Sequence, residues 1–296
     1  MKKTKLDKPL IAVMLVLMVI GLIMVLSASS MASYMRYHNS VYYYLIRQSI
    51  FMGIGLIGYL VALYFPTKLF KKTSPFLMII LILSLLGLII YGDVYGGTKG
   101  WYDLKVITIQ PSEIGKIIII LYLAYYYEKH KDDLDNQWTL LKPLLAIIIV
   151  FVLITIQPDL GTASVFFGIT ILIFYALPIK KETRGPINKI FLGGIALIAL
   201  SLLLTKGSFL RDYQLQRFNF IDPCKRYDEK TGYQLCNSLI AFNNGGLIGK
   251  GPGESTQKYL YLPESHTDFI YSIIVEEWGL VGGLVIIILY FYMLYR

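Results

Sequence analysis

The residues best suited to chemistry gather near the carboxyl end of the chain. Glu264, His266 and Asp268 stand just before the last long apolar run. A carboxylate at such a border is partly desolvated and is well placed to accept a proton as a general base. We therefore predict that Asp268 is a catalytic base. The alternative is a helix start at which Ser265 or Thr267 is only a cap.

Three further ionisable groups lie in or beside apolar runs, where inserting a charge costs roughly 2.5–3.5 kcal/mol. Glu113 and Lys116 are three residues apart and share one face of a helix, so they can neutralise each other. We predict that this pair lines a polar cavity open to the outside, and the alternative is an ion pair that only fixes packing. Asp159 follows Gln157 and Pro158, where we predict a tight turn between two spans because proline cannot continue a helix. Asp159 is either a functional group or a helix cap.

A polar segment between the last two apolar runs holds two more features. Glycines recur from residue 243 to 253, a density that suits a backbone wrapped around an anion such as a diphosphate, or a flexible loop. The ending of a Walker motif is absent from this sequence. Cys224 and Cys236, the only cysteines, either form a disulfide or are two unrelated thiols.

Several other kinds of site are excluded by spacing. The 3 histidines lack metal-ligand spacing, and the two cysteines lack the Cys-x-x-Cys redox spacing. The sequence contains no Gly-x-Ser-x-Gly nucleophile elbow.

The elements that position these groups are membrane-spanning helices. The chain has 296 residues, of which 56% are hydrophobic and only 16% are charged. Its apolar runs approach the roughly 18–20 residues that cross a bilayer as a helix. We predict about eight spans in one integral membrane domain, residues 1–296. The predicted spans are 9–27, 48–65, 75–91, 112–127, 143–157, 160–178, 190–205 and 267–294.

The basic residues give the predicted orientation. Despite a net charge of +9, Lys and Arg concentrate at the N-terminus and in alternate short loops, which is typical of cytoplasmic anchoring and not of nucleic-acid binding. The N-terminus is therefore predicted in the cytoplasm. Residues 206–266 then form one long extracellular loop, and Trp101, Asp159 and this loop all face outward.

Taken together, the motifs resemble the SEDS family (shape, elongation, division and sporulation), typified by RodA and FtsW. In chain order they are Gly97-Thr98-Lys99-Gly100-Trp101, Gln110-Pro111-Ser112-Glu113-Ile114-Gly115-Lys116, Gln157-Pro158-Asp159-Leu160-Gly161-Thr162-Ala163, Asn237-Ser238-Leu239-Ile240-Ala241 with Asn244-Gly245-Gly246, and Leu262-Pro263-Glu264-Ser265-His266-Thr267-Asp268-Phe269-Ile270 with Glu276-Glu277 and Gly279. The resemblance covers nearly the whole chain.

The resemblance implies an all-α, polytopic membrane helix bundle, C-terminally truncated by two of the ten family-typical helices. It implies an inverting glycosyltransferase that polymerises lipid II into peptidoglycan strands for cell division or elongation. It also implies a class B penicillin-binding protein as partner and a location in the bacterial cell membrane. The family's essential aspartate falls on Asp268, its acid–lysine pair on Glu113 and Lys116, and its Gln-Pro-Asp aspartate on Asp159.

This reading gives the candidate residues their roles. Asp268 is predicted to accept the proton of the attacking sugar hydroxyl, while Lys116, Lys99 or Arg217 stabilises the diphosphate leaving group. A divalent cation, Mg or Mn, is the one candidate cofactor. The remaining residues predicted to bind substrate are Glu113, Asp159, Trp101, Gln110, Ser112, Gln157, Ser238, Glu264 and His266.

Two functions of other classes remain open from the sequence. A flippase that moves lipid II across the membrane would also need charges within its spans, although it commonly has inverted repeats, and we find none in the sequence. A non-catalytic scaffold for a cell-wall synthase is the second. Movement of precursor without chain growth would indicate the flippase, and partner binding without either activity would indicate the scaffold.

Overall fold

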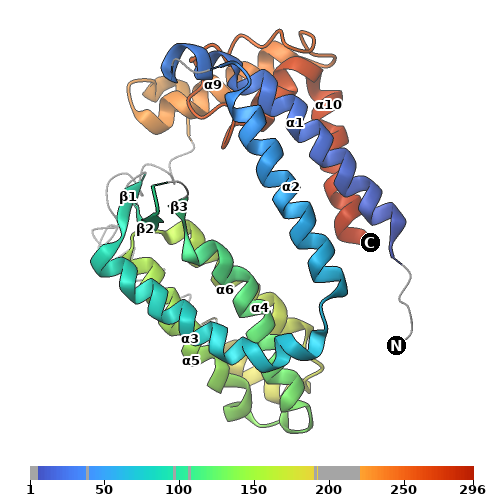
Figure 1. Ribbon diagram of the computed structural model, residues 1–296, viewed down its shortest axis with the longest axis vertical. Helices are drawn as coiled ribbons and strands as arrows, with labels where there is room; N and C mark the ends of the chain where they lie inside the picture. The colour runs from blue at the N-terminus through green and yellow to red at the C-terminus, as the bar shows by residue number, and fades with distance from the viewer. Residues whose placement is uncertain (1–5, 38–39, 96–97, 106–107, 190–191, 193–220) are drawn as a thin grey trace. The chain divides into compact units, whose positions relative to one another are not determined.

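The computed structural model describes residues 6–37, 40–95, 98–105, 108–189, 192 and 221–296. The chain divides into two compact units. Unit 1 comprises Met1–Leu63 and Gly207–Arg296, and unit 2 comprises Tyr64–Lys206. Helices account for most of the described residues in each unit (Figure 1).

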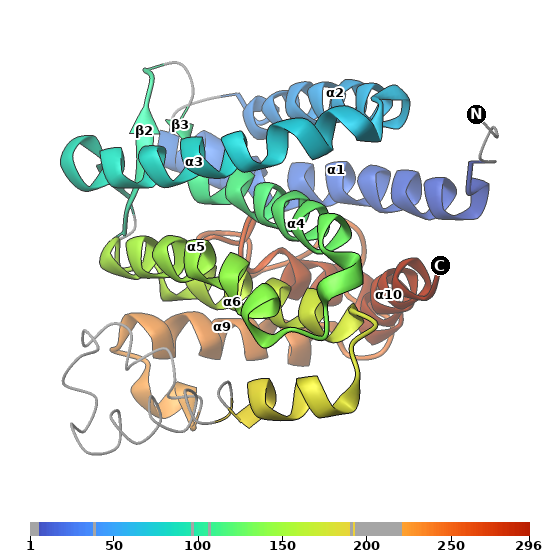
Figure 2. The same cartoon turned by 90° about the horizontal axis from the view of Figure 1, so that it is seen from below.

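Unit 2 is a helical bundle with a small sheet between its first two helices. Its described elements are α3 (Thr67–Tyr91), β1 (Asp93–Tyr95), β2 (Thr98–Asp103), β3 (Thr108–Ile109), α4 (Pro111–Lys129), η1 (Lys131–Asp133), α5 (Gln137–Ile156) and α6 (Leu160–Ala176), and residues 181–189 are also helical. Helix α3 packs on α4 and α5, and α6 packs on the same two helices (Figure 2). The strands are antiparallel in the order β1-β2-β3, with Asp93 opposite Trp101.

The core of unit 2 shows why these helices meet. Gly115 has no side chain, and a Cβ there would lie 2.9 Å from Leu81 Cδ1 and 3.0 Å from Phe166 Cζ. A small residue thus lets α4 approach α3 and α6 closely, which is how helices associate where lipid removes the hydrophobic driving force. The largest fully buried side chains of this core are Leu81, Leu85, Leu88, Ile119, Leu123, Leu140, Ile154, Phe166, Phe174 and Ile187.

Unit 1 contains α1 (Lys8–Tyr37), α2 (Tyr43–Tyr64), η2 (Pro223–Arg226), α9 (Lys230–Gly245) and α10 (Ile270–Tyr295). Helix α10 packs against both α9 and α1. Its buried Ile273 and Ile274 join Met24 and Ala28 of α1 and Leu262 of the preceding loop in one apolar cluster. The loop before α10 is therefore fixed to the helices by packing.

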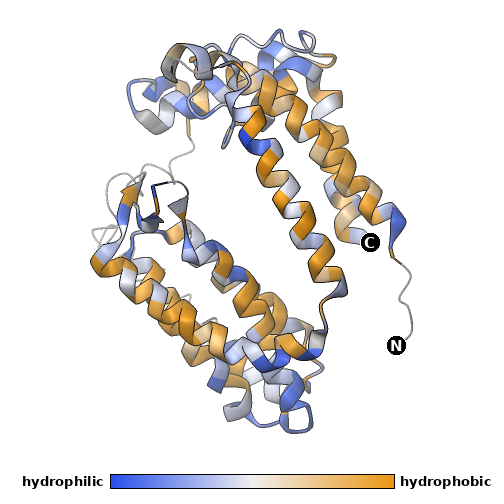
Figure 3. Cartoon of the chain, viewed as in Figure 1, coloured by the Kyte–Doolittle hydropathy of each residue, from blue (hydrophilic) through white to orange (hydrophobic). Residues whose placement is uncertain are grey.

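Among the described residues, five helices are long and apolar enough to cross a membrane: α1, α2, α3, α5 and α10. Apolar residues run along much of their length, as the colouring of Figure 3 shows. Each predicted span coincides with a helix except 190–205, most of which lies outside the described residues. The short sheet was not predicted, and part of the predicted long loop 206–266 is helix α9.

Candidate active site

Asp268 lies on a tight turn that leads directly into α10, and its side chain is exposed. The backbone N–H groups of Thr267 and Phe269 donate to the Glu264 carbonyl at 3.2 and 3.1 Å, which closes the turn. The Thr267 hydroxyl also donates to the Glu264 carboxylate at 3.2 Å. Within the described part of the chain, the Asp268 carboxylate has no hydrogen bond or ion pair. It is thus a free acceptor on an ordered turn.

Two neighbours anchor this turn to the helices of unit 1. The buried Ser265 hydroxyl donates to the Ala28 carbonyl of α1 at 3.3 Å. The His266 ring packs against Tyr44 of α2, with ring centroids 4.5 Å apart. The residue before α10, Phe269, makes no side-chain capping bond. The alternative that Ser265 or Thr267 only caps this helix is therefore wrong.

Asp159 is held by two donors at the start of α6. One carboxylate oxygen accepts the Thr162 N–H at 3.0 Å, so Asp159 is the N-cap of the helix. The other oxygen accepts the Gln110 side-chain amide at 3.3 Å. The turn predicted at Pro158 is confirmed, and so is the cap. The predicted contact of Asp159 with substrate stays a prediction.

Glu113 and Lys116 pair as their spacing predicts. Lys116 Nζ lies 2.8 and 2.9 Å from the two carboxylate oxygens of Glu113. The Glu113 side chain is 54% exposed and that of Lys116 28% exposed. Glu113 also stands in the first turn of α4, where the helix dipole favours a negative charge. The pair presents both charges on the surface of its unit.

Several predicted substrate contacts have structural partners within unit 2. Lys99 Nζ donates to the Ile89 carbonyl at 2.7 Å, so its charge lies at the C-terminal end of α3, as the helix dipole favours. Gln157 is buried and donates to the Leu85 carbonyl at 3.0 Å. Ser112 is also buried. These three contribute to the shape of the unit, whatever they contribute to binding.

Strand β2 carries Trp101, which is half-buried. Its neighbour Tyr102 donates its hydroxyl to the Ser84 carbonyl of α3 at 2.8 Å. Burial raises the pKa of Tyr102, so this hydroxyl stays a donor at ordinary pH. The backbone of β2 also passes close to two candidates, because a Cβ on Gly100 would lie 3.6 Å from Gln110 Nε2. The short sheet therefore places Gly100, the residue before Trp101, beside Gln110 and also beside Gln157, whose Oε1 would lie 3.8 Å from the same Cβ.

The predicted site residues thus fall into two groups, one in each unit. Unit 1 holds Glu264, His266, Asp268 and Ser238, and Ser238 is buried with its hydroxyl 2.8 Å from that of Ser272. Unit 2 holds Lys99, Trp101, Gln110, Ser112, Glu113, Lys116, Gln157 and Asp159. Arg217 lies outside the described residues.

Two adjacent glutamates of α10 form the centre of a polar network absent from the predicted site. The side chains of Glu276 and Glu277 are 0% and 1% exposed. Their partners are Ser27, Asn244, Lys250, Ser255, Thr256, Gln257 and Lys258. The signal available in the sequence was a pair of carboxylates inside an apolar run, which is costly to bury without partners.

The glycine-rich segment forms backbone hydrogen bonds with α10 on both sides of a break in that helix. Gly279 interrupts the helix with φ 72° and ψ −177°. The bonds that join the two run from Lys250 N to Glu276 O, from Gly251 N to Glu277 O, from Leu280 N to Gly246 O and from Val281 N to Leu247 O. The broken helix is thereby satisfied by backbone groups. The prediction of a diphosphate cradle is wrong for the Lys250 and Gly251 N–H groups, because both are occupied.

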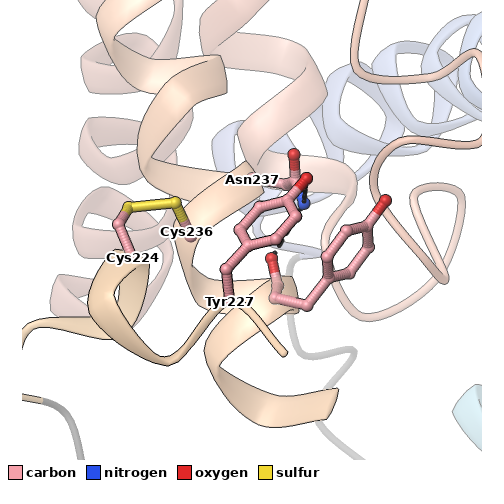
Figure 4. The surroundings of a disulfide bond; sticks show 5 residues. Cys224, Tyr227, Cys236 and Asn237 are labelled. Carbon is pink, nitrogen blue, oxygen red and sulfur yellow. Dashed lines mark hydrogen bonds between the residues drawn. A yellow bond between two sulfur atoms is a disulfide. The ribbon is translucent and has the colours of Figure 1, made fainter. Parts of the chain in front are cut away.

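Cys224 and Cys236 form a disulfide that ties η2 to α9, with an S–S distance of 2.03 Å (Figure 4). Beside it, the Asn237 amide donates to the Tyr233 carbonyl at 2.9 Å. Burial raises the pKa of Tyr233, whose ring packs edge-on against Tyr227. The segment before α10 is therefore cross-linked where it enters α9.

Comparison with known proteins places this geometry in a family. Residues 7–296 match the profile of the FtsW, RodA and SpoVE family, described as cell cycle protein. A relative from Bacillus subtilis (strain 168), named probable peptidoglycan glycosyltransferase FtsW, is 34% identical over 288 residues, covering 96% of this chain and 71% of the relative. One of the same name from Dichelobacter nodosus is 36% identical over 305 residues, covering 98% and 71%.

Two solved structures share the fold. One chain of a peptidoglycan synthase complex that coordinates polymerization and crosslinking matches with a TM-score of 0.69 at 23% identity, covering 98% of this chain and 76% of that one. The rod shape determining protein RodA of Thermus thermophilus matches with a TM-score of 0.61 at 20% identity, covering 100% and 75%. The predicted polytopic helical membrane fold is confirmed. The chain belongs to the FtsW, RodA and SpoVE family, which is the predicted SEDS family.

Proposed function

We propose that this protein is a peptidoglycan glycosyltransferase that polymerises lipid II into glycan strands at the outer face of the membrane, in cell division or elongation. The names of its relatives support the enzyme class. One observation carries the assignment of chemistry: the exposed Asp268 carboxylate has no hydrogen-bond or ion-pair partner in the described chain, although it stands on a turn closed by backbone bonds.

In this proposal Asp268 is the general base. It accepts the proton of the acceptor 4-hydroxyl as that oxygen forms a bond to the anomeric carbon of the donor sugar. The bond from this carbon to the diphosphate breaks at the same time, and its electron pair leaves with the lipid diphosphate. Attack from the opposite side inverts the configuration. The leaving group is a stable anion, so no strong general acid is needed.

The leaving diphosphate needs positive charge nearby. Lys116 is the best candidate, because the one carboxylate that pairs with it in the described residues, Glu113, is itself half exposed. In the portion that the structure describes, no group of three or more His, Cys, Asp or Glu side chains could hold a metal ion. We propose that a divalent cation taking part in the reaction is bound through the diphosphate oxygens of the substrate, as is usual for Mg²⁺.

The outer face is proposed as the side on which this chemistry occurs. The Cys224–Cys236 disulfide supports it, because disulfides persist in oxidising compartments. The distribution of Lys and Arg gives the same orientation, with a cytoplasmic N-terminus. A cysteine introduced next to His266 should react with a membrane-impermeant thiol reagent in intact cells. Labelling only after lysis would contradict this orientation.

A class B penicillin-binding protein is the proposed partner. The structural neighbour from a peptidoglycan synthase complex supports this pairing, because that complex coordinates polymerization and crosslinking. The partner would crosslink strands that this chain has made. Polymerisation should therefore be measured with the chain alone and with a candidate partner.

The central test compares Asp268→Ala and Asp268→Asn with wild type, using purified full chain and labelled lipid II. We expect polymer formation to fall on the order of 10²- to 10⁴-fold in both variants. Asp228→Asn, an exposed carboxylate of the same polar segment, is the matched control and should keep full activity. Undiminished polymer from Asp268→Ala would reject the base. Transport of lipid II into sealed vesicles without polymer would indicate a flippase instead.

A further inference from the structure

The carboxylate of Glu276 is saturated by one stretch of chain. One oxygen accepts the Ser255 hydroxyl at 2.5 Å and the Gln257 N–H at 3.1 Å. The other accepts the Thr256 hydroxyl at 2.8 Å, the Asn244 amide at 3.0 Å and the Lys250 ammonium at 3.3 Å. A carboxylate offers about four lone-pair sites, so none is left for a substrate or a metal.

Glu277 joins three segments through one buried ammonium group. Lys258 is 5% exposed, and its Nζ lies 3.0 Å from Glu277 Oε1, 3.1 Å from the Ser27 hydroxyl and 2.5 Å from the Gly253 carbonyl. Ser27 of α1 in turn donates to the same Glu277 oxygen at 2.5 Å. All three protons of the ammonium group are therefore engaged, and α1, the loop and α10 meet at this point.

The two glutamates bind the same loop whose backbone is hydrogen-bonded to α10 around the break at Gly279. Glu276 and Glu277 accept loop donors with their side chains and loop N–H groups with their carbonyls. A Cβ on Gly249 would collide with the Glu277 carbonyl, and one on Gly279 with the Leu247 carbonyl, so the backbones cross in direct contact. Residues 245–258 and the first part of α10 thus form one rigid body.

Asp268 stands two residues before the start of α10, on the turn that leads into this rigid body. A helix rises about 1.5 Å per residue, so Glu276 lies roughly 9 Å along the helix axis from its first residue, Ile270. A tilt of the first part of α10 would move the carboxylate relative to a bound sugar. Misplacing a catalytic group by about 1 Å can cost on the order of 10²-fold in rate.

We propose that the paired glutamates Glu276 and Glu277, with Lys258, are positioning residues that fix the first part of α10 and thereby set the Asp268 carboxylate against the attacking hydroxyl. The inference rests on the proposed glycosyltransferase function and refines its site. A buried ion pair is often no better for stability than apolar residues of similar size. The contribution of this pair is therefore geometric, and it appears in the rate of the chemical step.

The test uses purified full-length chain with labelled lipid II and measures kcat, KM, the pH dependence of kcat and the thermal unfolding midpoint. Glu276→Gln keeps the shape but turns an N–H₂ group toward donors. The double variant Lys258→Met with Glu277→Leu removes both charges together. Glu254→Gln is the matched control, an exposed carboxylate in the same loop.

We expect both variants to lower kcat on the order of 10- to 100-fold, with KM changed by less than about threefold and the acidic midpoint of the pH profile unchanged. The control should match wild type. A stable double variant with wild-type kcat would overturn the proposal. A shifted midpoint in Glu276→Gln would also overturn it, because Glu276 would then titrate in the reaction itself.

A milder variant decides the matter if neither of these folds. Ser27→Ala removes one hydroxyl from the Lys258–Glu277 junction, and we expect a loss of about threefold or more in kcat at unchanged KM. Wild-type kcat in Ser27→Ala would then refute the positioning role. Absence of polymer from the wild-type chain, with and without a candidate partner, would instead overturn the proposed function, so the two failures are distinguishable.

Discussion

Two carboxylate–lysine groups of this molecule have opposite surroundings. In unit 2, Glu113 and Lys116 bond to each other on the surface of α4, and the Glu113 side chain is 54% exposed. In unit 1, Glu276, Glu277 and Lys258 are 0%, 1% and 5% exposed, and the bonds to their charged atoms come from three separate segments. The first pair connects neighbours within one helix, whereas the second group connects parts of the chain that are distant in sequence.

The difference separates groups that can meet a substrate from groups that hold the backbone. A lysine with one half-exposed partner can exchange that partner for a phosphate oxygen, because little bonding is lost. A carboxylate with five donors cannot do so without breaking the loop that supplies them. The same criterion supports the proposal that Asp268, exposed and free of partners within the described chain, is the reactive carboxylate of unit 1.

The largest expected effect comes from removing one member of the buried ion pair of unit 1, which leaves the other charge without its partner. Glu277→Leu removes the carboxylate and strands the Lys258 ammonium, which should cost about 3–5 kcal/mol of unfolding free energy. Adding Lys258→Met should recover most of this loss, because no unpaired buried charge then remains at this junction. Chemical denaturation in detergent measures both. Equal losses in the single and the double variant would show that packing, and not the stranded charge, causes the effect.

A smaller effect is expected where the backbones cross. Gly249 has φ +90° and touches the backbone of Glu277 and Gly279, so Gly249→Ala combines a strained conformation with a collision and should cost roughly 3 kcal/mol. Gly253 has φ +83° but nothing within 4 Å of the added Cβ, so Gly253→Ala should cost only about 1 kcal/mol. Thermal unfolding of the two variants compares them. Similar losses of stability would mean that the positive φ alone, and not the contact between the two backbones, causes the destabilisation.

Unit 2 offers a buried polar group for the same comparison. Gln157 is 3% exposed and donates to the Leu85 carbonyl, so Gln157→Leu should cost about 0.5–1.5 kcal/mol by removing this buried hydrogen bond. This loss is smaller than that at Glu277 because no charge is involved. Denaturation under the same conditions provides the measurement. A loss of unfolding free energy larger than that of Glu277→Leu would contradict the view that the buried charges with hydrogen-bond partners contribute most to holding the backbone.

The fold was largely predictable because its signals are local. Runs of apolar residues locate the spans, and Pro158 ends α5 where the turn was expected. The Glu113–Lys116 bond follows from a spacing of three residues on a helix. Asp268 could be singled out because a carboxylate next to an apolar run is costly and therefore informative.

The rest depends on partners that lie far apart in the chain. Ser27 and Glu277 are separated by 250 residues, and no spacing rule connects them. The sequence predicts an anion cradle or a flexible loop for the glycine-rich segment from 243 to 253. The structure shows instead that residues 245–251 contact the break in α10 at Gly279. Sequence alone could show that Glu276 and Glu277 needed partners, and only the fold shows which residues these are.

The smallest expected effect on stability is at the exposed pair, and it is also the sharpest test of the comparison. Lys116→Met should change the unfolding free energy by about 0–1 kcal/mol, because half-exposed pairs contribute little. It should nevertheless lower polymerisation of lipid II on the order of 10²-fold, since the cation proposed to face the diphosphate is gone. The control is Lys71→Met, which breaks another exposed pair of unit 2, with Glu128. If Lys116→Met polymerised lipid II as well as Lys71→Met, the Glu113–Lys116 bond would serve packing only. Solvent exposure of a charged group would then no longer identify a group that binds the substrate.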